Sequence, residues 1–203
     1  MIAIFDYGAG NLRSVENTLD AIGARYQIVN DSAGLMAAEK IILPGVGHFG
    51  QMLRSLDALD VREALKERIA AGVPFLGICL GLQGLFESSD EAPQLEGLGV
   101  FSGRVVRFPQ TMTVPQMGWN KLQPQGSPSL LEGVGDQAYV YFANSYYVPA
   151  ETAAETAAAI CHYNGISLTA AIEAGNIHAV QFHPEKSGAV GQRVVRNFLG
   201  KQC

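Results

Sequence analysis

The first half of the chain alternates short apolar runs with stretches in which apolar residues recur every three or four positions. The runs are typical of buried strands, and the three-to-four spacing is typical of helices that cover a sheet. The expected strands are IAIFDY (2–7), YQIVN (26–30), KIILPGVG (40–47, broken at Pro44) and VPFLGI (73–78). The expected helices are 11–23 (capped by Asn11 and stopped by Gly23), 49–59, 61–71 and 80–87. This alternation predicts a parallel sheet with helices on both faces.

The second half is dominated by β-like runs separated by Gly, Pro, Asn and Asp, which predict antiparallel hairpins added to the parallel core. These runs are 99–108, 114–122, 137–148, 156–164 and 167–175. A last strand (177–182) and a closing helix (187–200) follow. We therefore expect an α/β fold: a single domain with a central mixed, mostly parallel sheet flanked by helices, with added antiparallel hairpins.

Composition narrows the class of protein. Apolar residues make up 48% of the 203 residues and charged residues 16%, as in a compact globular domain. The net charge of −5 argues against nucleic acid or an anionic membrane as partner. We find no signal peptide and no apolar run of the roughly 20 residues that a bilayer span needs. The three cysteines, Cys79, Cys161 and Cys203, lack zinc-type spacing, so we expect no metal and a cytoplasmic location.

One cysteine stands where an expected strand turns into an expected helix, in the sequence GICLG. Gly77 and Gly81 flank Cys79 in the pattern of a nucleophile elbow. So tight a turn leaves no room for side chains at the flanking positions and exposes the central side chain at the carboxyl end of the sheet. The backbone N–H of Leu80 then lies near any oxyanion formed when Cys79 attacks a carbonyl group. The alternative is a small buried cysteine at a close strand–helix contact.

A cysteine nucleophile requires a base, and the sequence VQFHPEKSG offers one. His183 ends the last expected strand, and Pro184 holds it extended, so that Glu185 can lie beside the imidazole and accept its N–H. An imidazole held by a carboxylate at the carboxyl edge of the sheet is the arrangement that activates a nucleophile. Because Cys79 is expected at the same edge, we predict that the two act together.

The other histidines fit this role less well. His162 neighbours Cys161, but adjacent strand residues point to opposite faces, so the two cannot form a dyad. His178 starts its strand and therefore lies at the opposite edge of the sheet. His48 follows the PGVG turn and is expected to start a helix.

A second loop follows a buried strand and therefore ends at the same edge as the cysteine. In LPGVGHFG (43–50), Gly45 and Gly47 allow the backbone to bend and to present N–H groups to a ligand. We expect a second oxyanion donor from Val46 or Gly47. An ordinary tight turn is the alternative.

Together, the motifs GICLGLQ, PGVG and HPEKS resemble the class I glutamine amidotransferases. The resemblance covers nearly the whole chain, taken as one glutamine amidotransferase type 1 domain over 1–203. VPQMGWN and YFANSYYV resemble the glutaminase subunits of imidazole glycerol phosphate synthase, of histidine biosynthesis. Asn144 departs from this pattern, because it stands where those subunits are expected to have histidine in HSYY.

The resemblance implies a Cys–His–Glu triad, whose members here are Cys79, His183 and Glu185. The thiolate attacks the side-chain amide carbon of glutamine, the imidazole protonates the departing ammonia, and water then releases glutamate from the thioester, without a cofactor. The oxyanion is held by the Leu80 N–H and a donor from 45–47. Gln83, one helical turn beyond the cysteine, binds the amino-acid end of the substrate with backbone near Ser145 and Tyr146.

The resemblance also implies a partner protein. Free ammonia is protonated and lost in water, so a glutaminase is useful only beside an acceptor site. We expect a heterodimer with a (β/α)8-barrel cyclase subunit that makes imidazole glycerol phosphate and aminoimidazole carboxamide ribotide. The candidates for the partner-facing surface are Asn11, Met117, Trp119 and Lys186. Methionine and tryptophan suit an interface, while a core position for Trp119 is the alternative.

Three competing functions are disfavoured by particular motifs. A glutaminase of another branch, serving an acceptor such as a pyridoxal phosphate synthase, is disfavoured by PQMGWN and HPEKS. A cysteine peptidase is disfavoured by the His-Pro-Glu spacing and by Gln83. A catalytically inactive binding subunit is disfavoured by the intact set of cysteine, histidine and glutamate.

Overall fold

The computed structural model describes residues 1–8 and 11–200; Cys203 lies outside the described residues. In this part of the chain one sheet contains eight strands, in the order β2-β1-β3-β4-β13-β12-β11-β8. In that spatial order, the bounds of the strands are β2 (Tyr26–Val29), β1 (Ile2–Phe5), β3 (Lys40–Gly45), β4 (Phe75–Cys79), β13 (Ile177–Val180), β12 (Ile166–Ala174), β11 (Ala157–Tyr163) and β8 (Gln123–Pro124).

The sheet is mixed, as the two halves of the sequence predict. The pairs β1–β2, β1–β3, β3–β4 and β4–β13 are parallel, and β12–β13, β11–β12 and β8–β11 are antiparallel. The C-terminal strand β13 thus joins the N-terminal parallel strands directly. Parallel strands place all their carboxyl ends at one edge, where open α/β sheets bind ligands.

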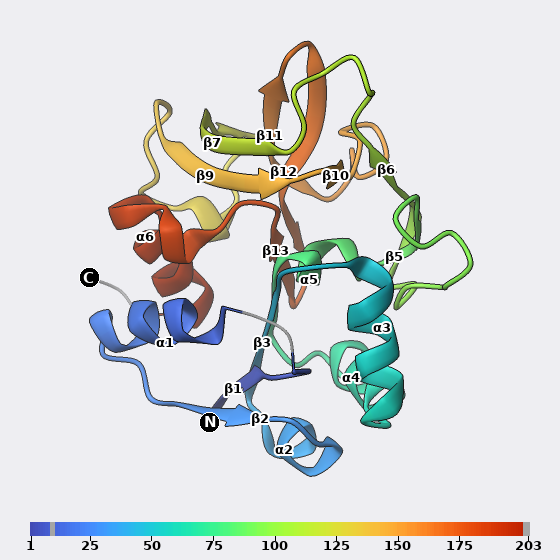
Figure 1. The fold of residues 1–203 in the computed structure, drawn as a ribbon. Helices are drawn as coiled ribbons and strands as arrows, with labels where there is room; N and C mark the ends of the chain where they lie inside the picture. Colours follow the sequence, from blue (N-terminus) through green and yellow to red (C-terminus); the bar gives the residue numbers. More distant parts are fainter. Residues whose placement is uncertain (9–10, 201–203) are drawn as a thin grey trace.

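Helices cover both faces of the parallel strands (Figure 1). On one face lie α1 (Leu12–Ala21) and α6 (Gly188–Leu199), and on the other lie α2 (Ser32–Ala37), α3 (Phe49–Ala58) and α4 (Arg62–Ala70). Gly200 ends α6 in the left-handed conformation (φ 69°), the helix stop that the sequence predicts. None of the described helices is long and apolar enough to cross a membrane.

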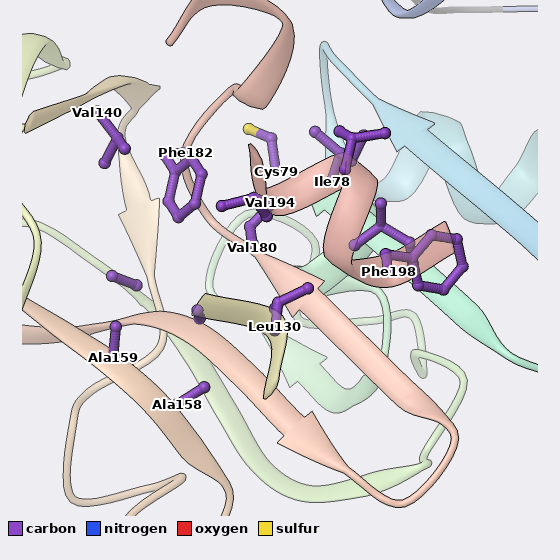
Figure 2. Packing of buried hydrophobic residues seen from close by; sticks show 14 of the residues in the cluster. Ile78, Cys79, Leu130, Val140, Ala158, Ala159, Val180, Phe182, Val194 and Phe198 are labelled. Carbon is purple, nitrogen blue, oxygen red and sulfur yellow. The ribbon is translucent and has the colours of Figure 1, made fainter. Parts of the chain in front are cut away.

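Apolar side chains from both halves of the sequence form the core on the α1–α6 face. Figure 2 shows Val194 and Phe198 of α6 gathered with Ile78 and Val180 of the two adjacent strands β4 and β13. All four side chains are 4% exposed or less. Because this cluster reaches Cys79, the position of the cysteine is set by core packing on this face.

Smaller sheets extend the fold beyond the carboxyl edge. One sheet contains β5 (Phe86–Ser89), β6 (Phe101–Arg107) and β10 (Tyr146–Tyr147), and another pairs β7 (Gln116–Lys121) with β9 (Tyr139–Asn144). A 3₁₀ turn, η1 (Ser129–Leu131), precedes β9. Antiparallel pairs expected in the second half are present: β11–β12 and β12–β13 are hairpins of the main sheet, and β7–β9 and β6–β10 pair in the smaller sheets. The pair β5–β6 differs from the expectation, because it is parallel.

The structure corrects three local expectations. The expected helix over 80–87 ends early: α5 spans Leu80–Gln83, and the chain then enters β5, where Phe86 pairs with Phe101. The strand β3 does not break at Pro44, because β1 pairs only as far as Ile42, so the missing N–H costs no ladder bond there. The short helix α2 was not expected, although Asp31 caps it by accepting from the backbone N–H of Gly34 at 2.8 Å.

Candidate functional site

Three neighbouring parallel strands end side by side at one edge of the sheet. In the register of the sheet, Gly45 of β3 lies beside Cys79 of β4, and Ile78 lies beside Val180 of β13. The segments that follow these strands therefore meet, although they are far apart in the sequence. They carry the glycine loop, the cysteine and the histidine that sequence analysis selects.

The cysteine corner requires its two glycines. A Cβ atom on Gly77 would lie 2.6 Å from the backbone oxygen of Gly81, and one on Gly81 would lie 2.1 Å from the backbone oxygen of Leu43. Cys79 itself has φ 53° and ψ −103°, a conformation that is strained for a residue with a side chain. Strain of this kind persists only where the surrounding structure imposes it, and it is concentrated at functional sites.

The histidine is held by a carboxylate. His183 Nδ1 lies 2.8 Å from Glu185 Oε1, across the 3₁₀ turn η2 (Pro184–Lys186), and the two side chains are 4% and 3% exposed. The backbone around His183 is fixed by its N–H, which donates to Tyr141 O at 2.8 Å, and by its C=O, which accepts from Ser187 Oγ at 2.7 Å. Because Glu185 occupies Nδ1, Nε2 is the nitrogen left for Cys79.

The cysteine and the histidine are coupled electrostatically. Burial by itself lowers the pKa of His183, but hydrogen bonds to Cys79 and Glu185, together with the negative charges of both, raise it from 6.5 to about 10. The raised pKa favours a protonated imidazole beside the sulfur of Cys79. The pair can therefore attack a carbonyl carbon and then supply a proton to the leaving group.

A cavity of about 340 Å³ opens onto the cysteine and the histidine. The lining residues that sequence analysis selects are Val46, Gly47, Cys79, Leu80, Gln83, Ser145, Tyr146, His183 and Lys186. The other lining residues are Glu91, Pro115, Ala143 and Asn144. Glu185 lies behind His183, outside this lining, as expected of a residue that orients the imidazole.

Both expected sources of oxyanion donors border the cavity. Leu80 begins α5 directly after the cysteine, and the Val46–Gly47 loop follows β3, with Gly47 at φ 98°. The carbonyl oxygen of Val46 accepts a long hydrogen bond, 3.5 Å, from the hydroxyl group of Tyr7. Burial raises the pKa of Tyr7, so this hydroxyl stays protonated and acts as a donor.

The expected substrate residues are joined by hydrogen bonds within the protein. Gln83 Nε2 donates to Tyr146 O at 2.9 Å and to Gln181 Oε1 at 3.0 Å, which uses both hydrogens of its amide. Asn144 Nδ2 donates to the same Tyr146 oxygen at 3.0 Å. The departure at Asn144 therefore still supplies a hydrogen bond at this position, and Gln83 braces the wall of the cavity.

Two polar residues of the site, Glu91 and Gln181, were not predicted from the sequence. Glu91 lies in the loop after β5 and accepts from the backbone N–H of Phe49 at 2.7 Å. It was missed because a helix, and no loop, was expected before it. Gln181 is fully buried, and its Nε2 lies 3.5 Å from Cys79 Sγ. Its position two residues before His183, on the same side of an extended segment, was a signal that could have found it.

The partner-surface candidates lie outside the cavity, except for Lys186. Met117 and Trp119 of β7 are 65% and 54% exposed, so a core position for Trp119 is excluded. The rings of Trp119 and Tyr141 meet edge to face at 6.1 Å, and Lys186 Nζ lies 5.6 Å from the centroid of the Tyr141 ring. Lys186 thus connects the cavity to this exposed surface, and Asn11 is exposed just before α1.

None of the other three histidines is part of the pair formed by Cys79 and His183. His48 caps α3 through Nδ1, which accepts from Gly50 N at 3.0 Å. His162 is exposed while its neighbour Cys161 is buried, as opposite faces of a strand require. His178 packs against Phe198 on the α6 side. Among the residues that the structure describes, no group of three or more His, Cys, Asp or Glu side chains is placed to hold a metal ion.

Comparison with known proteins gives a consistent result. The family model "Glutamine amidotransferase class-I" matches residues 3–202. "Imidazole glycerol phosphate synthase subunit HisH" of Methanothermobacter thermautotrophicus is 50% identical over 199 residues, covering 98% of each chain. The protein of the same name from Thermosynechococcus vestitus is 46% identical over 202 residues, covering 98% of this chain and 95% of the relative.

Solved structures share the fold at low sequence identity. A structure described as "Crystal structure of glutamine amidotransferase" has a TM-score of 0.71 at 19% identity, covering 98% of this chain and 97% of the other. The "Structure of PurLQS from Thermotoga maritima" contains a chain with a TM-score of 0.72 at 17% identity and the same coverage. At these identities the likeness concerns the arrangement of helices and strands alone.

Proposed function

The chain belongs to the class I glutamine amidotransferases, and we propose that it hydrolyses glutamine as the glutaminase subunit of imidazole glycerol phosphate synthase, in histidine biosynthesis. The observation that carries this proposal is His183, held by Glu185 at 2.8 Å and coupled to Cys79 at the wall of one cavity. The glutaminase domain is taken as the whole chain, 1–203. The reaction needs no cofactor.

In the proposed mechanism Cys79 acts as nucleophile and His183 as acid and base. The sulfur attacks the side-chain amide carbon of glutamine, and the N–H groups of Leu80 and of Val46 or Gly47 stabilise the resulting oxyanion. As the C–N bond breaks, the imidazolium gives its proton to the departing amine, which leaves as ammonia, and a γ-glutamyl thioester remains. The neutral imidazole then takes a proton from water, and the resulting hydroxide adds to the thioester carbon. The C–S bond breaks as the new C–O bond is kept, which releases glutamate and returns Cys79 as a thiolate beside the imidazolium.

The remaining cavity residues are assigned to the amino-acid end of glutamine. This end carries an ammonium and a carboxylate, so the site must offer both an acceptor and donors. The Glu91 carboxylate suits the ammonium group. Backbone groups at Ser145 and Tyr146, with Gln83 behind them, suit the carboxylate and fix the depth at which the side chain enters.

We assign the exposed surface around Met117 and Trp119 to a (β/α)8-barrel cyclase partner in a heterodimer. Exposed Met and aromatic side chains are typical of protein interfaces. Lys186 lies between this surface and the cavity, and Asn11 completes the proposed contact. The partner receives ammonia without release to solvent and uses it to make imidazole glycerol phosphate and aminoimidazole carboxamide ribotide. We assign the complex to the cytoplasm, with no role for nucleic acid or membrane.

The test is glutamate release from glutamine by the purified chain, first alone and then with the cyclase and its nucleotide substrate. We expect little hydrolysis by the chain alone and a many-fold increase in the mixture. Equal activity with and without the cyclase would support glutamine hydrolysis by the chain but refute its activation by the partner. Absence of hydrolysis from folded protein in both would refute the proposed glutaminase. Stimulation by the barrel subunit of a different pathway instead would refute the assignment to histidine biosynthesis.

A further inference from the structure

A buried glutamine contacts the sulfur of the proposed nucleophile. Gln181 follows β13 directly and is 0% exposed. Its Nε2 lies 3.5 Å from Cys79 Sγ, an ordinary N–H···S separation given the larger radius of sulfur. The glutaminase mechanism above makes no use of this contact, although a fully buried amide must satisfy its hydrogen-bonding groups within the protein.

The orientation of this amide is fixed by a chain of hydrogen bonds that starts at a backbone carbonyl. The oxygen of Tyr146 can only accept, so the Gln83 amide must present its NH₂ group to it, at 2.9 Å. The second hydrogen of that NH₂ group points to Gln181 Oε1, at 3.0 Å. With its oxygen engaged by Gln83, Gln181 must present its own NH₂ group to the sulfur of Cys79.

The reverse orientation of Gln181 is disfavoured at both ends. A flipped amide would set its NH₂ group against the NH₂ group of Gln83 and its oxygen against the sulfur, with no donor between either pair. Water cannot replace Gln83 as the partner of the Gln181 oxygen, because the Gln181 side chain is fully buried. The donor at the sulfur is therefore imposed by the fold.

We propose that Gln181 is a catalytic residue of the glutaminase, whose side-chain N–H stabilises the Cys79 thiolate and holds its sulfur in position for attack. This proposal rests on the proposed function for its substrate but not for its chemistry, because a thiolate can be observed without glutamine. A hydrogen bond to a charged acceptor is stronger than one to a neutral acceptor, so the amide favours thiolate over thiol. Gln83 is then a positioning residue that acts through Gln181.

The test compares Gln181→Met, which keeps the volume and removes the donor, with Gln181→Glu, which keeps the shape and replaces the donor by a carboxylate oxygen. The first readout is alkylation of Cys79 by iodoacetamide at neutral pH, followed by mass spectrometry of the peptide that contains this residue. Cys161 serves as an internal reference, because burial raises its pKa to about 11 and keeps it a thiol. The second readout is kcat and KM for glutamine hydrolysis with the cyclase partner.

We expect Gln181→Met to slow alkylation and to lower kcat by about 10- to 100-fold, the range implied by one lost hydrogen bond to a charged group. KM should change less than about threefold, since Gln181 does not line the substrate cavity. Gln181→Glu should react more slowly still, because its carboxylate repels the thiolate. Alkylation and kcat at wild-type values in either folded variant would overturn the proposal.

A matched control separates a catalytic effect from loss of a buried hydrogen bond. Thr169 is also 0% exposed and donates through its hydroxyl to Pro149 O at 3.2 Å, away from the cavity. Thr169→Val should lower stability without slowing alkylation of Cys79. If it slows alkylation as much as Gln181→Met does, the effect is structural and the proposal is wrong. If wild-type protein alkylates rapidly at Cys79 but hydrolyses no glutamine with its partner, the proposed function fails while this test still decides the role of Gln181.

Discussion

Replacing Gly81 by alanine tests whether the cysteine corner is built on direct contact between β3 and α5. The new Cβ atom would lie 2.1 Å from the backbone oxygen of Leu43 and 3.2 Å from its carbonyl carbon. Real Cβ atoms essentially never approach another atom closer than 3.0 Å, so strand and helix must separate by roughly 1 Å. The obstructing group is backbone in the middle of the sheet and cannot rotate away.

The expected loss of folding stability depends on which neighbouring atom must move to make room for the new Cβ atom. Overpacking of a core typically costs about 1–3 kcal/mol, and a rigid obstacle places Gly81→Ala at the upper end, about 3 kcal/mol. At Gly84 the new Cβ would meet the flexible end of Met52, Cε at 2.6 Å, so we expect about 1 kcal/mol. At Gly135 there is nothing within 4 Å and φ is ordinary, so alanine should stabilise by roughly 0.5 kcal/mol.

Urea unfolding of the three variants measures this order, and glutamine hydrolysis with the partner measures its consequence. A displacement of about 1 Å at a nucleophile can cost about 100-fold in rate, so Gly81→Ala should lose activity beyond its loss of folded protein. Gly135→Ala should retain full activity. If Gly81→Ala unfolds at the same urea concentration as Gly135→Ala and stays active, the contact between β3 and α5 does not constrain the corner and the reasoning is refuted.

Three further predictions follow from the site and from the exposed surface. Cys79→Ser should lower glutamine hydrolysis by at least about 1,000-fold while glutamine still binds; measurable turnover near the wild-type rate would exclude the cysteine as nucleophile. The folded protein holds the His183 proton more tightly than the unfolded chain, since its pKa is raised from 6.5 to about 10. This contribution to stability is therefore complete below pH 6.5 and is lost as the pH rises towards 10. Urea unfolding across this range should show the loss in wild-type protein and a smaller loss in a Cys79→Ala variant; equal losses would contradict the coupling. Trp119→Ala and Met117→Ala should change the unfolding free energy by less than about 0.5 kcal/mol but should weaken stimulation by the cyclase about tenfold. Ile28→Ala, at an exposed position (45%) on β2, is the control and should leave stimulation unchanged.

The sequence was most informative about features that a few neighbouring residues determine. Gly77 and Gly81 around a cysteine predict a corner, and the structure contains the backbone contacts that require both glycines. The pattern His-Pro-Glu predicts a carboxylate beside an imidazole, and the two groups lie at 2.8 Å. Both features depend on backbone geometry over a few residues, which residue type and spacing determine directly.

The sequence was least informative where distant segments decide the structure. The run from Leu80 to Glu87 suits a helix by itself, but the helix ends at Gln83, and pairing of Phe86 with Phe101 makes its last two residues the start of β5. Glu91 reaches the cavity only because of that change. In the sequence, Gln181 looks like an ordinary residue of an extended strand. Its contact with Cys79 exists only because β13 lies beside β4.

The place of β13 in the sheet has a consequence for synthesis of the chain on the ribosome. Strand β4, with Phe75 to Cys79 fully apolar, is complete long before residues 177–180 emerge to pair with it. Until then the edge of β4 that later pairs with β13 has no neighbouring strand, and strands of other chains can pair with this apolar edge. In the same interval the nucleophile has been made but its base has not. The nascent chain is therefore unable to hydrolyse glutamine during the period in which it is most prone to aggregate, and insertion of β13 ends both conditions in one step.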